Sequence, residues 1–213
     1  MFVTMKLPKA GATIAAAVSA LAVTALLAGC TPSSEPTVLP STEIDWLDSA
    51  PADEDPYAAA ARAADLGSVL AWNAHDFTIT QLTSTVTPEL AAAYYENFQP
   101  LQRLVFPGPR PSSVISVVEN DSGDGAQVVL CRVSKGWQLS SGETRPIADL
   151  TAGTETTYTV VTSSAGSLVV SAEQPSGIAC DATSAAVGYF EPTPVIPDKL
   201  ENDDVRPPIG YEG

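Results

Sequence analysis

Basic residues and histidine are scarce in this sequence. Ten Lys and Arg residues stand against 25 Asp and Glu residues, and His75 is the single histidine. The net charge of −15 repels phosphate groups, so we expect no nucleic-acid partner. A Ser-His-Asp site would have to use His75, and no Gly-x-Ser-x-Gly elbow accompanies it. A phosphate-cradling glycine loop and a Cys-x-x-Cys pair are also absent, so neither kind of site is indicated.

The N-terminus has the order of an export signal. Lys6 and Lys9 precede residues 11–28, which are largely apolar and contain no charged residue. This stretch ends in Leu27-Ala28-Gly29-Cys30, which resembles the lipobox of bacterial lipoproteins in its leucine, small, small, cysteine pattern. An uncleaved transmembrane anchor is the alternative, since about 18 apolar residues could just span a bilayer.

The lipobox resemblance implies that residues 1–29 are a signal peptide and that Cys30 carries a diacylglyceryl group with acyl chains such as palmitate. The protein would then be a lipoprotein on the outer face of the bacterial cytoplasmic membrane. Residues 1–29 contain two lysines and no acids, so the mature chain has eight basic residues and a net charge of −17. Such a surface is repelled by anionic headgroups, so the acyl chains must supply attachment, at about 0.8 kcal/mol per buried CH₂. Met1 and Met5 open this signal equally well.

Two cysteines remain once Cys30 is assigned to lipid. Cys131 and Cys180 are an even pair in an exported domain, which indicates a disulfide because the compartment outside the membrane is oxidising. Closing a loop of 50 residues would stabilise the fold by roughly 4 kcal/mol in the chain-entropy model. Two buried free thiols are the alternative. Two cysteines and one distant histidine do not make a metal ligand set, so we expect no metal and no cofactor.

Composition divides the mature chain into three parts. Residues 31–55 hold four prolines and seven acids without a basic residue, and residues 191–213 hold five prolines and six acids. Such segments bury too little apolar surface to order themselves, so we expect a tether at 30–55 and a disordered tail at 191–213. The Ile44-Asp45-Trp46-Leu47 cluster is the exception, and it could dock on the domain or on a partner. Residues 56–190 have the length of one ordinary domain.

The domain opens with helical patterns. Asp55 is a helix cap before Pro56, and apolar residues recur near a 3.6-residue period up to Trp72. Thr87 and Pro88 form a second helix start, which predicts a helix over residues 88–98. The proline-rich stretch at 107–111 then ends any helix.

The second half of the domain has the composition of strands. Runs rich in Val, Ile, Thr and Tyr, separated by glycine turns, predict two hairpins, with strands over residues 113–119, 126–133, 154–163 and 167–173. Helices followed by an antiparallel sheet indicate an α+β fold. The turn at Asp121-Ser122-Gly123-Asp124-Gly125 loosely resembles a calcium loop, but it lacks the bidentate Glu, and we interpret it as a hairpin tip.

The order of these elements resembles a family. Two amphipathic helices, the phrase Leu70-Ala71-Trp72-Asn73-Ala74-His75-Asp76-Phe77, the Thr87-Pro88 helix start and the long hairpins are similar to the NTF2-like, or SnoaL-like, cone fold of small exported lipoproteins of Gram-positive bacteria. The resemblance covers residues 55–181. It implies a curved sheet that wraps the first helix and leaves a cavity, which some members use for catalysis and many for binding.

Two sets of residues are candidates for such a site. His75 and Asp76 follow the first helix, where the resemblance implies acid-base work, although a lone histidine at a helix end is more often a surface or capping residue. Aromatic residues on the helices could line the pocket, although such residues are usually core: Trp72, Tyr94, Tyr95, Phe98 and Phe106. With one histidine to supply a base, we expect a mostly apolar cavity with few titratable groups.

Two functions of different classes follow. The favoured hypothesis is a non-enzymatic binding or scaffold module in the cell envelope, whose partner is another envelope protein or a small apolar ligand. The alternative is a cone-fold hydrolase, isomerase or dehydratase that acts through His75 and Asp76. A third possibility is that tether and tail are the functional parts and the domain is a spacer.

Overall fold

A computed structural model describes most of the chain after its N-terminal segment. The described residues are 39, 42–48, 50–51, 55–98, 104–140, 150–196 and 204–211, and all belong to the compact unit Ser33–Gly213. The predicted signal peptide and Cys30 lie outside them. Within these ranges, no helix is long and apolar enough to cross a membrane.

The described residues form three helices, two of which begin at the predicted cap motifs. α1 (Pro56–Ala74) begins at Asp55, whose carboxylate accepts from the backbone N–H groups of residues 57 and 58 at 2.8 and 2.9 Å. α3 (Pro88–Glu96) begins at Thr87, whose hydroxyl accepts from the backbone of residue 90. The short α2 (Thr80–Thr83) was not predicted, because four residues are too few to show a period.

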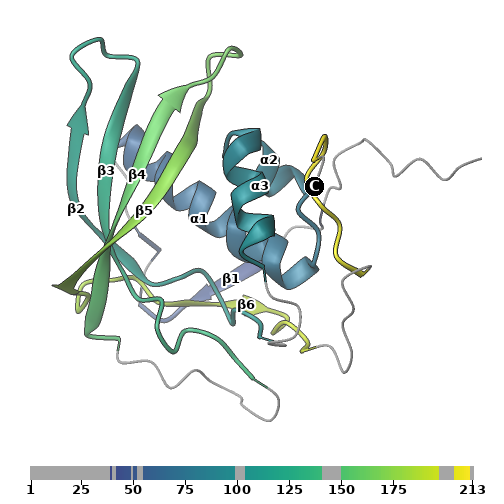
Figure 1. Cartoon of the computed structure of the whole chain (residues 1–213). Coiled ribbons are helices and arrows are strands. Elements are labelled where there is room, and N and C mark those ends of the chain that lie inside the picture. The colour runs from purple at the N-terminus through teal and green to yellow at the C-terminus, as the bar shows by residue number, and fades with distance from the viewer. Residues whose placement is uncertain are drawn as a thin grey trace, which may run out of the picture. The chain divides into compact units, whose positions relative to one another are not determined.

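The four long strands form one antiparallel sheet, so the predicted α+β class is confirmed. β2 (Ser112–Glu119), β3 (Gly125–Arg132), β4 (Ala152–Thr162) and β5 (Leu168–Asp181) lie in the order β2-β3-β4-β5. Both predicted hairpins are present, and β5 runs eight residues beyond its predicted end at 173. The helices lie on one face of this sheet (Figure 1).

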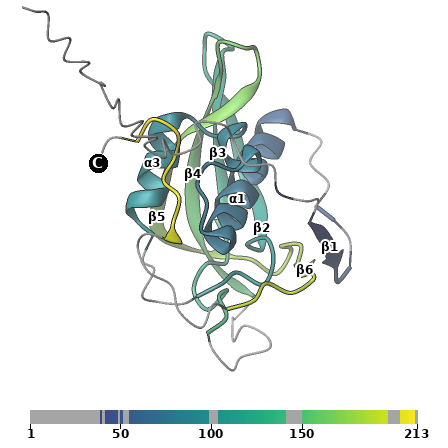
Figure 2. The same cartoon turned by 90° about the vertical axis from the view of Figure 1, so that its right-hand side faces the viewer.

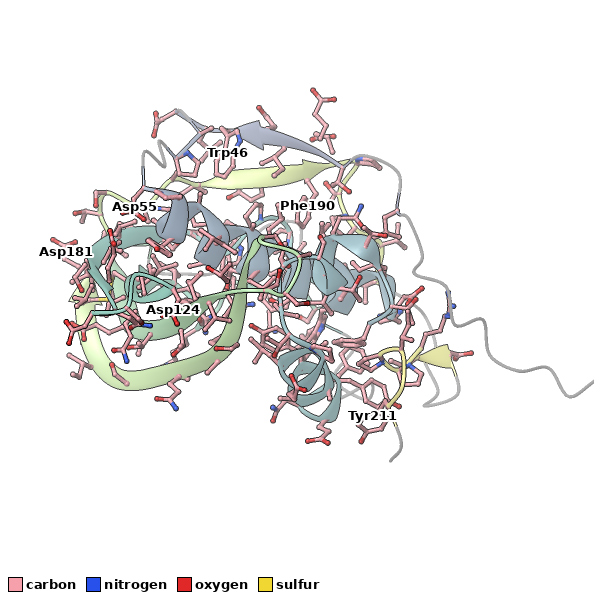
Figure 3. All side chains as sticks on the ribbon, turned by 90° about the horizontal axis from the view of Figure 1, so that it is seen from above. Trp46, Asp55, Asp124, Asp181, Phe190 and Tyr211 are labelled. Carbon is pink, nitrogen blue, oxygen red and sulfur yellow. A yellow bond between two sulfur atoms is a disulfide. The ribbon has the colours of Figure 1, made fainter. Side chains whose placement is uncertain are left out.

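A second, two-stranded sheet joins part of the predicted tether to the end of the predicted domain. β1 (Glu43–Trp46) pairs with β6 (Gly188–Glu191), with Ile44 opposite Phe190. Gly188 permits this contact, because a Cβ there would lie 2.6 Å from Ile44 Cγ2. Figure 3 shows Trp46 and Phe190 on this sheet. Docking of the 44–47 cluster on the domain is confirmed, and the disordered-tether prediction is wrong for residues 43–46.

The predicted disordered tail is also wrong for residues 204–211. The Arg206 N–H donates to the His75 carbonyl oxygen, and the Phe77 N–H donates to the Arg206 carbonyl oxygen, both at 2.9 Å. Val205 is buried, and the Tyr211 ring lies 5.0 Å from a tyrosine ring of α3. Figure 2 shows the segment beside α3. Proline and acid content predicted disorder here, but a few apolar anchors and one backbone ladder suffice to order the segment.

The core lies between α1 and the large sheet. α1 contacts all four strands of that sheet. The fully buried side chains include Val69 from α1, Val128 and Leu130 from β3, and Val160 from β4. α1 is therefore held along its length, which gives any site between helix and sheet a rigid floor.

The predicted disulfide is confirmed and spans three strands. Cys131 of β3 and Cys180 of β5 are joined with their Cα atoms 5.8 Å apart. β4 runs between them, and its Gly153 lies under the bridge. A Cβ at Gly153 would lie 2.6 Å from Cys131 Sγ and 3.2 Å from Cys180 Sγ. The bridge can cross β4 only because a glycine stands at that position.

Candidate functional site

A cavity of about 710 Å³ lies between α1, α3, the C-terminal end of β3 and the middle of β5. One wall is aromatic, with Trp72 from α1 and Phe106 from the segment after α3. The lining also includes charged side chains, among them Arg110, Arg132 and Glu173. The cavity is thus amphipathic, with both aromatic and charged side chains in its walls.

Three of the five predicted pocket aromatics line this cavity: Trp72, Tyr94 and Phe106. Phe98 is buried, with its ring 4.6 Å from that of Trp72. Tyr95 packs against Phe77 at 5.6 Å on another side of α3. Adjacent helix positions are about 100° apart, so Tyr94 and Tyr95 cannot both face the cavity. The prediction is wrong for Tyr95 and Phe98, which serve the core and the docked C-terminal segment.

The polar wall is anchored by Asp65, a buried carboxylate of α1 that is only 4 % exposed. Its oxygens lie 2.9 Å from Arg132 Nη1 and 3.1 Å from Arg110 Nε, and one accepts from the Tyr158 hydroxyl at 2.9 Å. Burial by itself would raise the pKa of Asp65, but the two guanidinium groups and the tyrosine hydroxyl hold it below its usual value. Asp65 therefore remains ionised at neutral pH.

The network continues from Arg132 to the rim of the cavity. Arg132 Nη1 lies 2.6 Å from a Glu173 oxygen, and the other Glu173 oxygen accepts from the Tyr94 hydroxyl at 2.6 Å. Strand register brings these groups together, since Tyr158 on β4 is directly opposite Glu173 on β5. Burial and the nearby Glu173 charge raise the pKa of Tyr94, so its hydroxyl stays protonated and donates.

Arg110 is held from several sides. It donates through Nη2 to the Ser68 hydroxyl, and its guanidinium carbon lies 5.3 Å from the centre of the Phe106 ring. Asn73 of α1 fixes this segment, because its amide donates to the Phe106 carbonyl oxygen and accepts from the Phe106 N–H, both at 2.8 Å. Arg110 also lines a smaller cavity of about 190 Å³ beside β1, so it forms part of the wall between the two.

The expectation of a cavity with few titratable groups is wrong. Arg110, Arg132, Lys135 and Glu173 all line it. Sequence reasoning missed them because each stands alone in its own element, and no local pattern connects a carboxylate in α1 with cations 45 and 67 residues later.

His75 and Asp76 lie elsewhere. His75 ends α1 with a φ of 53°, and burial lowers its pKa, while the Asp204 charge opposes that shift. The Asp76 carboxylate accepts from the Thr78 backbone and hydroxyl at 2.8 and 2.6 Å and pairs with Arg206 at 2.9 Å. Neither residue lines the large cavity, the smaller one beside β1, or the two grooves near residues 208–211 and Phe190. Their contacts support the helix end and the docked C-terminal segment.

The Asp121–Asp124 segment is the tip of the β2–β3 hairpin. Gly123 has a φ of 69°, as such a turn requires, and the Ser122 hydroxyl donates to Asp124. Among the described residues, no group of three or more His, Cys, Asp or Glu side chains is arranged to hold a metal ion.

Comparisons with protein-family models, with curated proteins and with solved structures find no significant match to this chain. The functional argument therefore depends on the geometry of the cavity and its walls.

Proposed function

We propose that this protein is an exported lipoprotein, held through lipid on Cys30 at the outer face of the cytoplasmic membrane, whose domain binds a small molecule. The export signal and the lipobox-like Leu27-Ala28-Gly29-Cys30 support the anchor. We further propose that the domain has the NTF2-like cone architecture. Helices on one face of a four-stranded sheet, with a cavity between them, support that assignment.

The amphipathic cavity is the observation that carries the proposal. Its volume of about 710 Å³ lies within the usual range for small-molecule sites, roughly 300 to 1,000 Å³. Its aromatic wall offers apolar area, and its charged wall offers a few oriented polar groups. That combination is typical of a binding pocket.

The protonation states favour binding over turnover. A general acid or base works best with a pKa near the operating pH. The pKa of Asp65 is lowered and the pKa values of Tyr94 and Tyr158 are raised, so each keeps one protonation state near neutrality. An enzyme that acts through His75 and Asp76 is less well supported, because Asp76 is engaged with Thr78 and Arg206 outside the cavity.

The test is to fill the cavity. Ala93 lines it from α3, whereas its neighbour Ala92 faces a different groove, beside residues 208–211. Full-length protein should bind the neutral fluorescent probe N-phenyl-1-naphthylamine. Ala93→Trp should abolish binding, and Ala92→Trp and His75→Ala should retain it. Equal binding by Ala93→Trp and wild type would refute the proposed site, and loss of binding in a folded His75→Ala variant would move the site to the end of α1.

A further inference from the structure

The charge of the cavity is opposite to the charge of the protein. Arg110, Arg132 and Lys135 line it, and Glu173 is the single acid among its described lining residues. The whole chain has ten basic residues against 25 acids. Three cations gathered in one hollow of an acidic protein create a local field that attracts an anion.

Each of these cations retains capacity for a further bond. Arg110 donates through Nε to Asp65 and through Nη2 to Ser68, and no described group accepts from its Nη1. Arg132 donates through Nε to Ser134, while its other described hydrogen bonds and ion pairs all use Nη1. Lys135 is exposed and makes no ion pair with the described residues. Since an arginine has five N–H donors, both guanidinium groups can donate further hydrogen bonds to an anionic ligand.

The buried acids set the net charge and hold the cations in place. Asp65 and Glu173 offset two of the three positive charges, which leaves one in excess. Asp65 binds both arginines, and this keeps their planes fixed before any ligand arrives. Such preorganisation lowers the entropic cost of binding. A single excess positive charge in the cavity suits a ligand with a single negative charge.

We propose that the ligand is an amphipathic organic monoanion with a carboxylate head and an apolar body. The carboxylate binds at Arg110, Arg132 and Lys135, where guanidinium groups match its planar geometry. The apolar body packs against Trp72 and Phe106. This inference rests on the proposed binding function and specifies the class of ligand.

A matched pair of dyes tests the charge requirement. The anionic probe 8-anilinonaphthalene-1-sulfonate carries a sulfonate in place of the carboxylate, and N-phenyl-1-naphthylamine is the same molecule without it. Full-length protein should bind the anionic dye at least about fivefold more tightly, and salt should weaken only that dye. Lys135→Gln should weaken the anionic dye about threefold to tenfold and leave the neutral dye unchanged. Arg206→Gln is the matched control, since it removes one charge from a side chain outside the cavity.

Competition identifies the source of the carboxylate. Displacement of the anionic dye by decanoate would indicate a lipid-derived fatty acid, and displacement by 2-naphthoate would indicate an aromatic acid. If decanol or 2-naphthol displaces the anionic dye as effectively as the corresponding acid does, the inference is overturned. Equal affinity for both dyes, with Lys135→Gln without effect, would overturn it too while leaving the binding function intact. If neither dye enters the cavity, both proposals fail.

Discussion

Asp65→Asn should be among the most destabilising polar substitutions in this domain. Asn has nearly the same shape as Asp, so the change removes the charge and leaves the packing. Arg132, 5 % exposed, would then be buried with only Glu173 to balance it, and Arg110 would lose its 3.1 Å ion pair. Removing one partner of a buried ion pair costs about 3 to 5 kcal/mol. For a domain of this size that corresponds to a fall in Tm of roughly 6 to 20 °C.

The same carboxylate gives a pH signature. The folded-state pKa of Asp65 is lowered from 3.8, so its contribution to stability is fully present above that value and is lost as pH falls through the lower folded pKa. The difference in the free energy of unfolding between wild type and Asp65→Asn should therefore be constant near neutrality and shrink only below about pH 4.

Urea unfolding followed by circular dichroism, repeated between pH 3 and pH 8, measures both effects. Asp124→Asn is the control, because Asp124 is a fully exposed carboxylate at a hairpin tip, and its loss should lower Tm far less than the loss of Asp65. A loss below about 1 kcal/mol for Asp65→Asn, the range of exposed pairs, would refute the argument that this network is desolvated and holds the cavity wall.

Other variants test the disulfide and the anchor. Cys131→Ser and Cys180→Ser should each destabilise the domain by roughly 4 kcal/mol in urea unfolding, and the double variant should cost little more, because either change removes the same bond. Gly153→Val should lower the free energy of unfolding by about 1 to 3 kcal/mol when the disulfide is intact, and by less in the variant that carries both Cys→Ser changes. An equal loss in both backgrounds would show that the disulfide does not restrict this position. Cys30→Ser should block acyl labelling and leave the protein uncleaved or shed into the medium, whereas unchanged processing and membrane retention in cell fractionation would contradict the lipobox interpretation.

Short stretches of sequence were enough to predict the elements whose signals lie within a few residues. Asp55 before Pro56 and Thr87 before Pro88 predicted two helix starts, because a cap and its first turn are contiguous. The two hairpins followed from alternating strands around glycine turns. Cys131 and Cys180 could be paired by counting, since only two cysteines remained.

Composition was misleading where a few residues override the average. The segments around β1 and residues 204–211 are rich in proline and acids, yet Ile44 packs on Phe190 and Arg206 pairs with Asp76. The average composition of a short segment does not show that one of its residues will bind a partner more than 100 residues away in the chain.

The candidate site could not be predicted from local sequence, because its residues come together only in the folded domain. Asp65 and Tyr158 are 93 residues apart, and Tyr94 and Glu173 are 79 apart, so no spacing in the chain connects them. Taken alone, Asp65 is one polar residue in a helix and Arg132 is the last residue of a strand. The fold lays α1 across the sheet and thereby brings these charges together in a low-dielectric interior, where their mutual attraction is strong enough to shape the cavity wall.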